Sequence, residues 1–145
     1  MNKYPQSYTS ARDMLQGRSR CKVAHNTNLE ALPIDGQVVF GIRYHATVVA
    51  RWHENGTLQL NTGGWKTSTT AIRIRGVLPP GVYLRVERGS WFLEDVRPGF
   101  LPSGSVYPDI DAKSRKRLSV PFQEGILVSP NRSLHGLDRI GAPTP

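Results

Sequence analysis

The dipeptide Asn55-Gly56 constrains this chain most, because it lies between two short segments with a strand pattern. Residues 47–52 are rich in β-branched residues, and Leu58 and Leu60 alternate with polar residues in 57–61. Asn-Gly tolerates the positive φ that tight hairpins require, so the pattern predicts a β-hairpin. Eleven prolines and fourteen glycines among 145 residues argue against a helical bundle, since both residues interrupt helices. We therefore expect short antiparallel strands.

Two further regions carry a clear strand pattern. Residues 38–44 are β-branched and aromatic, with alternate apolar residues on one face, and Gly41 within them is expected to mark a bulge. Residues 82–86 and 91–93 flank a short polar segment that contains Gly89, which predicts a second hairpin.

Weaker patterns predict additional strands. Residues 23–29 alternate enough for an edge strand, followed by a turn at 32–36. Residues 118–122 and 125–128 predict a third hairpin around Gln123-Glu124, either packed on the main sheet or used for self-assembly.

Two segments favour helices. In residues 10–17, Ser10 is a candidate N-cap, Asp13 takes the capping-box position and Gly17 suits the left-handed C-terminal position. Residues 71–78 have apolar spacing that ends before Pro79-Pro80, although residues 72–75 also alternate as in a strand. We favour a helix there.

These elements predict a mainly β protein, a β-rich α+β fold. It is expected to be a small antiparallel meander of hairpins, with one or two short helices and extended basic terminal arms. The length suits one domain. The predicted organisation is a basic N-terminal arm with a short helix at 1–22, a β-rich core domain at 23–96, a Pro/Gly-rich basic linker at 97–117, and a hairpin with a C-terminal tail at 118–145.

The net charge of +8 favours polyanionic partners, of which nucleic acid is the commonest. A solubilising excess of charge, or a basic face that docks on an acidic protein, is the alternative. The single cysteine, Cys21, excludes an intramolecular disulfide and a thiolate metal site. Without an apolar run of signal-peptide or membrane-spanning length, the expected location is the cytoplasm and no membrane partner is expected. The oligomeric state stays open.

Two cationic clusters are candidate nucleic-acid contacts, because dense cations bind phosphates through counterion release. Ordinary solvated linkers have the same composition. The clusters comprise Arg18, Arg20 and Lys22 near the N-terminus, and Lys113, Arg115, Lys116 and Arg117 in the linker.

Trp65 follows Gly63-Gly64, a pair that lets the backbone turn closely. Its indole either stacks on a base or another ligand, or it is a core or corner residue of the domain. The hydroxyls of residues 67–70 suit phosphate contact or simple helix capping.

Lys66, Arg73 and Arg75 add cations after this turn. In a strand Arg73 and Arg75 share one side, whereas in a helix they diverge by about 200°. At least one of them is expected on a solvated face.

No pattern of residues indicates catalysis. His25, His45 and His53 lack enough acids and thiols around them for a metal site. Asp109 and Asp111 before Lys113 have a nuclease-like composition, but acids two residues apart do not match two strands that converge on one ion. We expect no enzyme, no metal and no cofactor.

Residues 44–92 contain an ordered set of short motifs: a Tyr-His-Ala-Thr strand at 44–47, Asn55-Gly56-Thr57, a Gly-Gly-Trp turn at 63–65, Thr69-Thr70, and Gly89-Ser90-Trp91. This set resembles a family of small proteins encoded by tailed bacteriophages, most of which have no assigned function. The resemblance implies a phage origin and no particular reaction.

The sequence thus predicts a phage-encoded, non-enzymatic accessory protein that binds DNA or RNA through basic arms and a face of the β domain. The alternative is a module that binds a host or phage protein, such as an inhibitor of a host transcription or defence complex, or a virion component.

Overall fold

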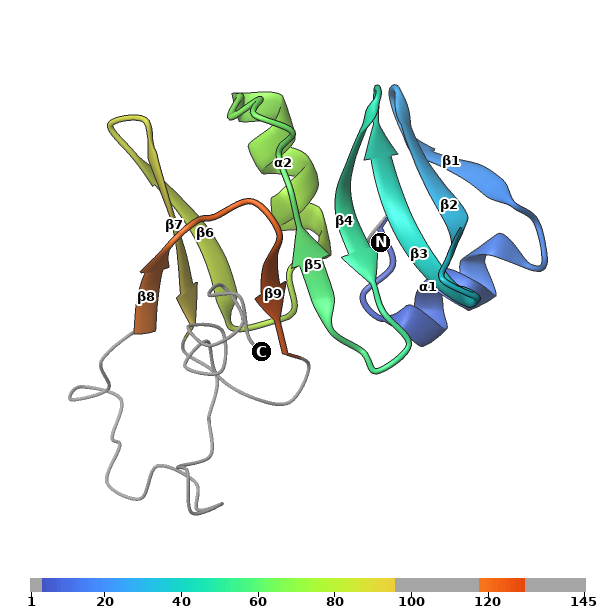
Figure 1. Ribbon diagram of the computed structural model, residues 1–145. Coiled ribbons are helices and arrows are strands. Elements are labelled where there is room, and N and C mark those ends of the chain that lie inside the picture. Colours follow the sequence, from blue (N-terminus) through green and yellow to red (C-terminus); the bar gives the residue numbers. More distant parts are fainter. Residues whose placement is uncertain (1–3, 96–117, 130–145) are drawn as a thin grey trace, which may run out of the picture.

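The computed structural model describes residues 4–95 and 118–129. Figure 1 shows two antiparallel sheets with α2 beside both of them. The larger sheet has the strand order β1-β2-β3-β4-β5-β9, and the smaller has the order β6-β7-β8. The prediction of a mainly β fold built from antiparallel hairpins with two short helices is confirmed.

The hairpin predicted around Asn55-Gly56 is formed by β4 (Thr47–Trp52) and β5 (Leu58–Leu60). Its turn spans more than two residues, because the backbone N–H of His53 bonds the carbonyl of Thr57 at 2.9 Å. Within this turn only Gly56 has a positive φ, of 90°, and Asn55 instead accepts the N–H of Thr57 through its side chain. Asn55 therefore contributes an Asx turn and not a left-handed backbone.

The first three strands form two tight hairpins. The edge strand predicted at 23–29 is wrong: β1 (Arg20–Ala24) and β2 (Thr27–Ile34) are separate strands joined at His25-Asn26. The turn predicted at 32–36 shrinks to Asp35-Gly36, and β3 (Gln37–Tyr44) follows. Pro33 is tolerated within β2 because β1 pairs no further than Glu30, so its missing N–H removes no bond between strands.

Gly41 is needed for close packing and not for a bulge. It pairs regularly with Arg51, and the register shifts one residue later, where Val49 is the extra residue of β4. A Cβ on Gly41 would lie 2.8 Å from Cδ1 of Leu32 and 2.9 Å from Cγ1 of Val48. The side chains of Leu32 and Val48 therefore occupy the space above the glycine.

Helix α1 (Tyr8–Leu15) begins earlier than predicted. Ser7 is its N-cap and Ser10 is the third helical residue, and the two side chains bond each other's backbone N–H groups in a capping box. Ala11 and Leu15 are buried in the core, so this helix packs on the larger sheet. The predicted boundary between residues 22 and 23 falls inside β1.

Helix α2 (Ser68–Val77) confirms the helical interpretation of its segment. Thr67 caps it by accepting the N–H of Thr70 at 3.2 Å. Ile74 and Val77 are fully buried, whereas Ile72 on the opposite face is 54% exposed. The helix contacts β4 of the larger sheet and β6 (Val82–Glu87) of the smaller one, which pairs with β7 (Ser90–Asp95).

The predicted third hairpin is wrong. Strand β8 (Leu118–Pro121) pairs with β7, and β9 (Ile126–Val128) pairs with β5, so the segment adds one strand to each sheet. Between them Phe122 is 6% exposed and its ring lies 5.6 Å from that of Trp91. Apolar and polar residues alternate in this segment because one side of each strand is buried. A hairpin between the two strands would give the same pattern, so the pattern could not distinguish the two arrangements.

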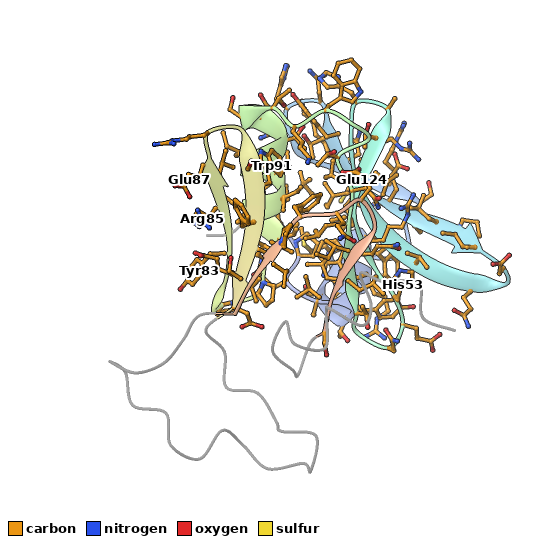
Figure 2. All side chains as sticks on the ribbon, turned by 60° about the vertical axis from the view of Figure 1, so that its left-hand side comes forward. His53, Tyr83, Arg85, Glu87, Trp91 and Glu124 are labelled. Atoms are coloured by element: carbon orange, nitrogen blue, oxygen red, sulfur yellow. The ribbon has the colours of Figure 1, made fainter. Side chains whose placement is uncertain are left out.

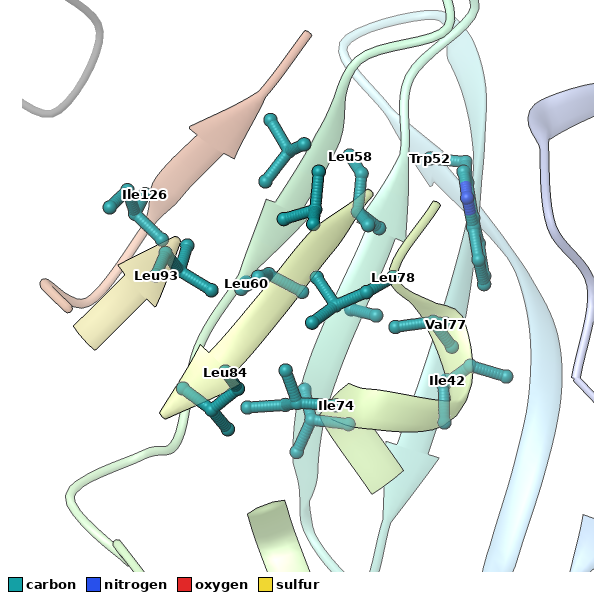
Figure 3. Packing of buried hydrophobic residues seen from close by; sticks show 14 of the residues in the cluster. Ile42, Trp52, Leu58, Leu60, Ile74, Val77, Leu78, Leu84, Leu93 and Ile126 are labelled. Atoms are coloured by element: carbon teal, nitrogen blue, oxygen red, sulfur yellow. The ribbon is translucent and has the colours of Figure 1, made fainter. Parts of the chain in front are cut away.

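The core lies between the two sheets and α2 (Figure 3). Each of its fully buried aliphatic side chains contributes about 1.5–3 kcal/mol relative to exposure. The cluster includes Ile42, Leu60, Ile74, Val77, Leu84, Leu93 and Ile126. Within the described residues, neither helix has the length and apolar character that crossing a membrane requires.

Candidate functional site

A cavity of about 480 Å³ opens between the β3–β4 turn and the segment that leads from β5 into α2. The described residues that line it come from the end of β3, the turn after it, the start of β4, and the segment from Thr62 into the first turn of α2. They are Tyr44, His45, Ala46, Thr47, Val49, Thr62, Trp65, Thr67, Thr69 and Thr70.

Aromatic rings form the wall of the cavity that comes from the β3–β4 turn. His45 has a left-handed backbone with φ of 52°, and its N–H bonds the carbonyl of Asn26 at 3.0 Å. Its ring centroid lies 4.4 Å from that of Tyr44, and the guanidinium of Arg73 lies 5.0 Å from the Tyr44 ring centre. The cationic group and both rings therefore hold one another in place.

The opposite wall is the turn at Thr62–Trp65. The N–H of Trp65 bonds the carbonyl of Thr62 at 3.0 Å, which closes the turn. The backbone of Gly63 lies directly against the side chain of Thr47 in β4, within the space that a Cβ would need. This contact joins the two walls.

Trp65 lies at the mouth of the cavity with 68% of its surface exposed. Trp52 and Trp91 are buried in the core, at 2% and 5%. No aromatic ring in the described part of the chain stacks on Trp65. Of the core or corner position that the sequence allowed for Trp65, the core is thus wrong, and Trp65 is an exposed residue of the turn.

The hydroxyls at the start of α2 divide into two kinds. The Thr67 hydroxyl accepts the N–H of Thr70 and donates to the hydroxyl oxygen of Thr70, so capping explains both side chains. The hydroxyls and backbone N–H groups of Ser68 and Thr69 have no hydrogen-bond partner among the described residues, as expected in the first turn of a helix.

The predicted cations near the turn point in different directions, as the helical alternative required. Arg73 bonds Oγ1 of Thr27 at 2.9 Å and the carbonyl of His25 at 3.3 Å, behind Tyr44. Arg75 donates two hydrogen bonds of 3.2 Å to the carbonyl of Leu84 in β6 and does not line the cavity. Lys66 is exposed next to Trp65.

The N-terminal cations are not part of this site. Arg18 donates to the carbonyls of Leu15 and Met14 and so caps the C-terminal end of α1. Arg20 and Lys22 are exposed at alternate positions of β1 and share one side of that strand. The cationic run of Lys113, Arg115, Lys116 and Arg117 lies outside the described residues.

Sequence reasoning missed Glu124 as a residue of this site. Its carboxylate accepts hydrogen bonds from Thr62 and Gly63, 62 and 61 positions away along the chain, so no local pattern could indicate the contact. Tyr44 was named only for the phage resemblance, and His45 for that and for a metal site that was rejected, although both line the cavity.

A larger and more open hollow of about 630 Å³ lies beside the β4–β5 turn. Nε2 of His53 and Oε1 of Gln59 hydrogen-bond each other there at 3.0 Å, and the described residues of the lining include no Phe, Tyr or Trp. In the described ranges, no three His, Cys, Asp or Glu side chains gather as metal ligands would. Neither observation indicates a ligand.

The motifs at 44–47 and at 63–65 and 69–70, which carry the resemblance, lie on facing walls of the cavity around Trp65. The convergence is a property of the fold, since β4 and β5 separate the two stretches in sequence. No protein-family model, no curated protein and no solved structure matches the chain.

Proposed function

We propose that the chain is a phage-encoded, non-enzymatic accessory protein that binds single-stranded nucleic acid at the cavity beside Trp65. The observation that carries the proposal is the exposed indole of Trp65 at the mouth of a cavity of about 480 Å³. Exposing a large aromatic side chain to water is unfavourable, and single-strand binding proteins use such rings to stack bases.

The geometry favours single strands over duplexes. Stacking on Trp65 requires an unpaired base, because the faces of paired bases are covered by their neighbours. Each stacked base contributes about 1–3 kcal/mol by alanine substitution. A single exposed ring suits contact with one or two bases and little sequence preference.

Groups that suit phosphate surround the ring. Lys66 is exposed beside it, and the free N–H and hydroxyl groups of Ser68 and Thr69 lie at the positive end of α2. Threonine and serine hydroxyls, lysines and helix N-termini are common phosphate contacts. They position a strand without reading its sequence.

The proposal is tested by replacing Trp65 with alanine and comparing Ile72→Ala as a matched control. Both side chains are large, apolar and more than half exposed, but Ile72 does not line the cavity. Fluorescence anisotropy with a labelled oligo(dT), an oligo(U) and a duplex of equal length measures binding at low salt. Trp65→Ala should weaken single-strand binding about 5- to 150-fold and leave the melting temperature unchanged.

Ile72→Ala should change neither affinity nor melting temperature. Absence of binding by the unmodified chain at low salt would refute the proposal, since electrostatic attraction is strongest there. Tighter binding of the duplex than of the single strand would refute the stacking mode.

A protein-binding function is the second candidate, and the outer side of the smaller sheet favours it. Tyr83 is 51% exposed on the edge strand β6, beside Arg85 and Glu87 (Figure 2). Arg85 pairs with Glu94 at 3.1 Å and lies 4.5 Å from the ring centre of Phe92. The hydrogen bond to Glu94 raises the pKa of the Arg85 guanidinium further, so the side chain stays charged.

An exposed tyrosine next to a fixed arginine is typical of protein interfaces. Affinity capture from phage-infected lysate after nuclease treatment separates the two candidates. A stoichiometric partner that survives nuclease and is lost with Tyr83→Ala supports the second. Loss of all captured protein on nuclease treatment supports the first.

A further inference from the structure

The carboxylate of Glu124 accepts three hydrogen bonds from Thr62 and Gly63, which lie 62 and 61 positions earlier in the chain. Glu124 lies in the connection between β8 and β9 (Figure 2). Its carboxylate reaches the turn that contains Gly63. Oε1 accepts the N–H groups of Thr62 at 2.6 Å and of Gly63 at 2.9 Å. Oε2 accepts the hydroxyl of Thr62 at 2.6 Å. Three donors thus share one carboxylate, and a charged acceptor makes stronger hydrogen bonds than a neutral one.

Thr62 extends this contact to the rest of the turn. Its hydroxyl oxygen accepts the N–H of Gly64 at 3.1 Å, and its carbonyl accepts the N–H of Trp65 at 3.0 Å. The backbone N–H groups of all four residues from Thr62 to Trp65 are therefore bound either by Glu124 or by Thr62. Thr62 itself is 1% exposed, so the loss of Glu124 would leave the buried hydroxyl of Thr62 without an acceptor for its proton.

The backbone on both sides of Glu124 is itself held in place. The N–H of Gly125 bonds the carbonyl of Leu60 at 2.8 Å, and the side chain of Gln59 donates to the carbonyl of Gly125 at 3.4 Å. On the other side of Glu124, Phe122 is buried against Trp91. Glu124 therefore projects from a segment that is bonded to β5 and packed on β7.

We infer that Glu124 is a positioning residue, which holds the Thr62–Trp65 turn in the conformation that presents Trp65 and forms one wall of the cavity. For its effect on binding this inference rests on the proposed function. For its effect on the surroundings of Trp65 it stands alone.

The first test uses the full chain without nucleic acid. Labelling with 5-fluorotryptophan gives one ¹⁹F resonance for each of Trp52, Trp65 and Trp91, and Trp65→Phe assigns the resonance of Trp65. In Glu124→Ala the Trp65 resonance should shift toward that of free fluorotryptophan and narrow, while the resonances of Trp52 and Trp91 stay in place.

Glu54→Ala is the matched control, because Glu54 is also exposed in a turn but makes no hydrogen bond or ion pair with the described residues. It should move none of the three resonances. Glu124→Gln keeps an oxygen that can accept the N–H groups of Thr62 and Gly63, and it should restore the Trp65 resonance most of the way. An unmoved Trp65 resonance in Glu124→Ala would overturn the inference, as would equal movement of all three.

The second test measures oligo(dT) affinity in a double-mutant cycle. If Glu124 acts through Trp65, Glu124→Ala weakens binding by up to the loss seen for Trp65→Ala, and adding it to Trp65→Ala weakens binding no further. Fully additive losses would overturn the inference. If the unmodified chain binds no nucleic acid, the proposed function fails, and the ¹⁹F measurement still decides the role of Glu124.

Discussion

Gly63 meets two separate requirements at one position. Its φ is 64°, in the left-handed region that side chains rarely adopt, and a Cβ there would lie 2.8 Å from Oγ1 of Thr47. Gly64 has a φ of 88°, but a Cβ on Gly64 would meet nothing within 4 Å. A side chain at Gly64 would therefore cause backbone strain alone, whereas one at Gly63 would cause backbone strain and a steric clash.

Gly64→Ala should lower the free energy of unfolding by about 1–2 kcal/mol, the cost of a left-handed backbone for a residue with a Cβ. Gly63→Ala should lower it by more, because the new methyl group also meets the side chain of Thr47. Urea denaturation of the two variants measures the difference. Adding Thr47→Gly to Gly63→Ala should recover part of it, and equal losses in the two single variants would show that Thr47 moves aside freely.

At this scale the sequence identified Trp65 and its glycines but not the environment of the indole. A Gly-Gly-Trp turn is compatible with a buried corner and with an exposed ring, because the choice depends on what packs against the turn. Here the β3–β4 turn and Glu124 do so, and both are distant in sequence. Arg73 and Arg75 show the opposite case, since helical geometry alone fixed their divergence.

Elements with a local signal were predicted well. The hairpins β4–β5 and β6–β7 have glycine-containing turns between alternating strands, and α2 has an N-cap and a proline stop. Strands β8 and β9 were identified as strands but assigned the wrong partners. Their alternation states which side chains are buried, and it carries no information on which edge each strand joins.

A substitution at Phe122 tests whether the connection between β8 and β9 couples the two sheets. Phe122 is 6% exposed, packs edge-on against Trp91, and its N–H bonds the carbonyl of Trp91 at 2.9 Å. Phe122→Ala should lower the free energy of unfolding by about 3–5 kcal/mol. Phe92→Ala is the control, because Phe92 is half-buried on the outer side of β7, against Arg85, and should cost less.

Hydrogen exchange by mass spectrometry shows where Phe122→Ala acts. Because β8 pairs with β7 and β9 with β5, protection should fall in both β5 and β7 together. A loss confined to the smaller sheet would mean that the two sheets unfold independently and that the segment does not couple them.

Most of the net positive charge of the chain lies outside the described residues. The described residues hold eleven of the nineteen cations and eight of the eleven acids, and therefore only +3 of the net charge of +8. Among the described cations, Arg18, Arg73 and Arg75 bond carbonyl or hydroxyl oxygens of the protein, and Arg43 and Arg85 pair with acids. We expect the domain to supply the stacking contact and the remaining sequence to supply most of the electrostatic affinity.

This division predicts that two sets of substitutions change different terms of the binding free energy. Replacing Lys113, Arg115, Lys116 and Arg117 with alanine should reduce the slope of log K against log salt, by as much as about 2.8 if all four contact a single strand. Trp65→Ala should lower affinity equally at every salt concentration and leave the slope unchanged, because stacking releases no counterions. Oligo(dT) titrations of both variants, from about 50 to about 500 mM NaCl, measure the two slopes. A slope that is unchanged without the four cations would assign the electrostatic term to the domain, with Lys66, Arg20 and Lys22 as its next candidates.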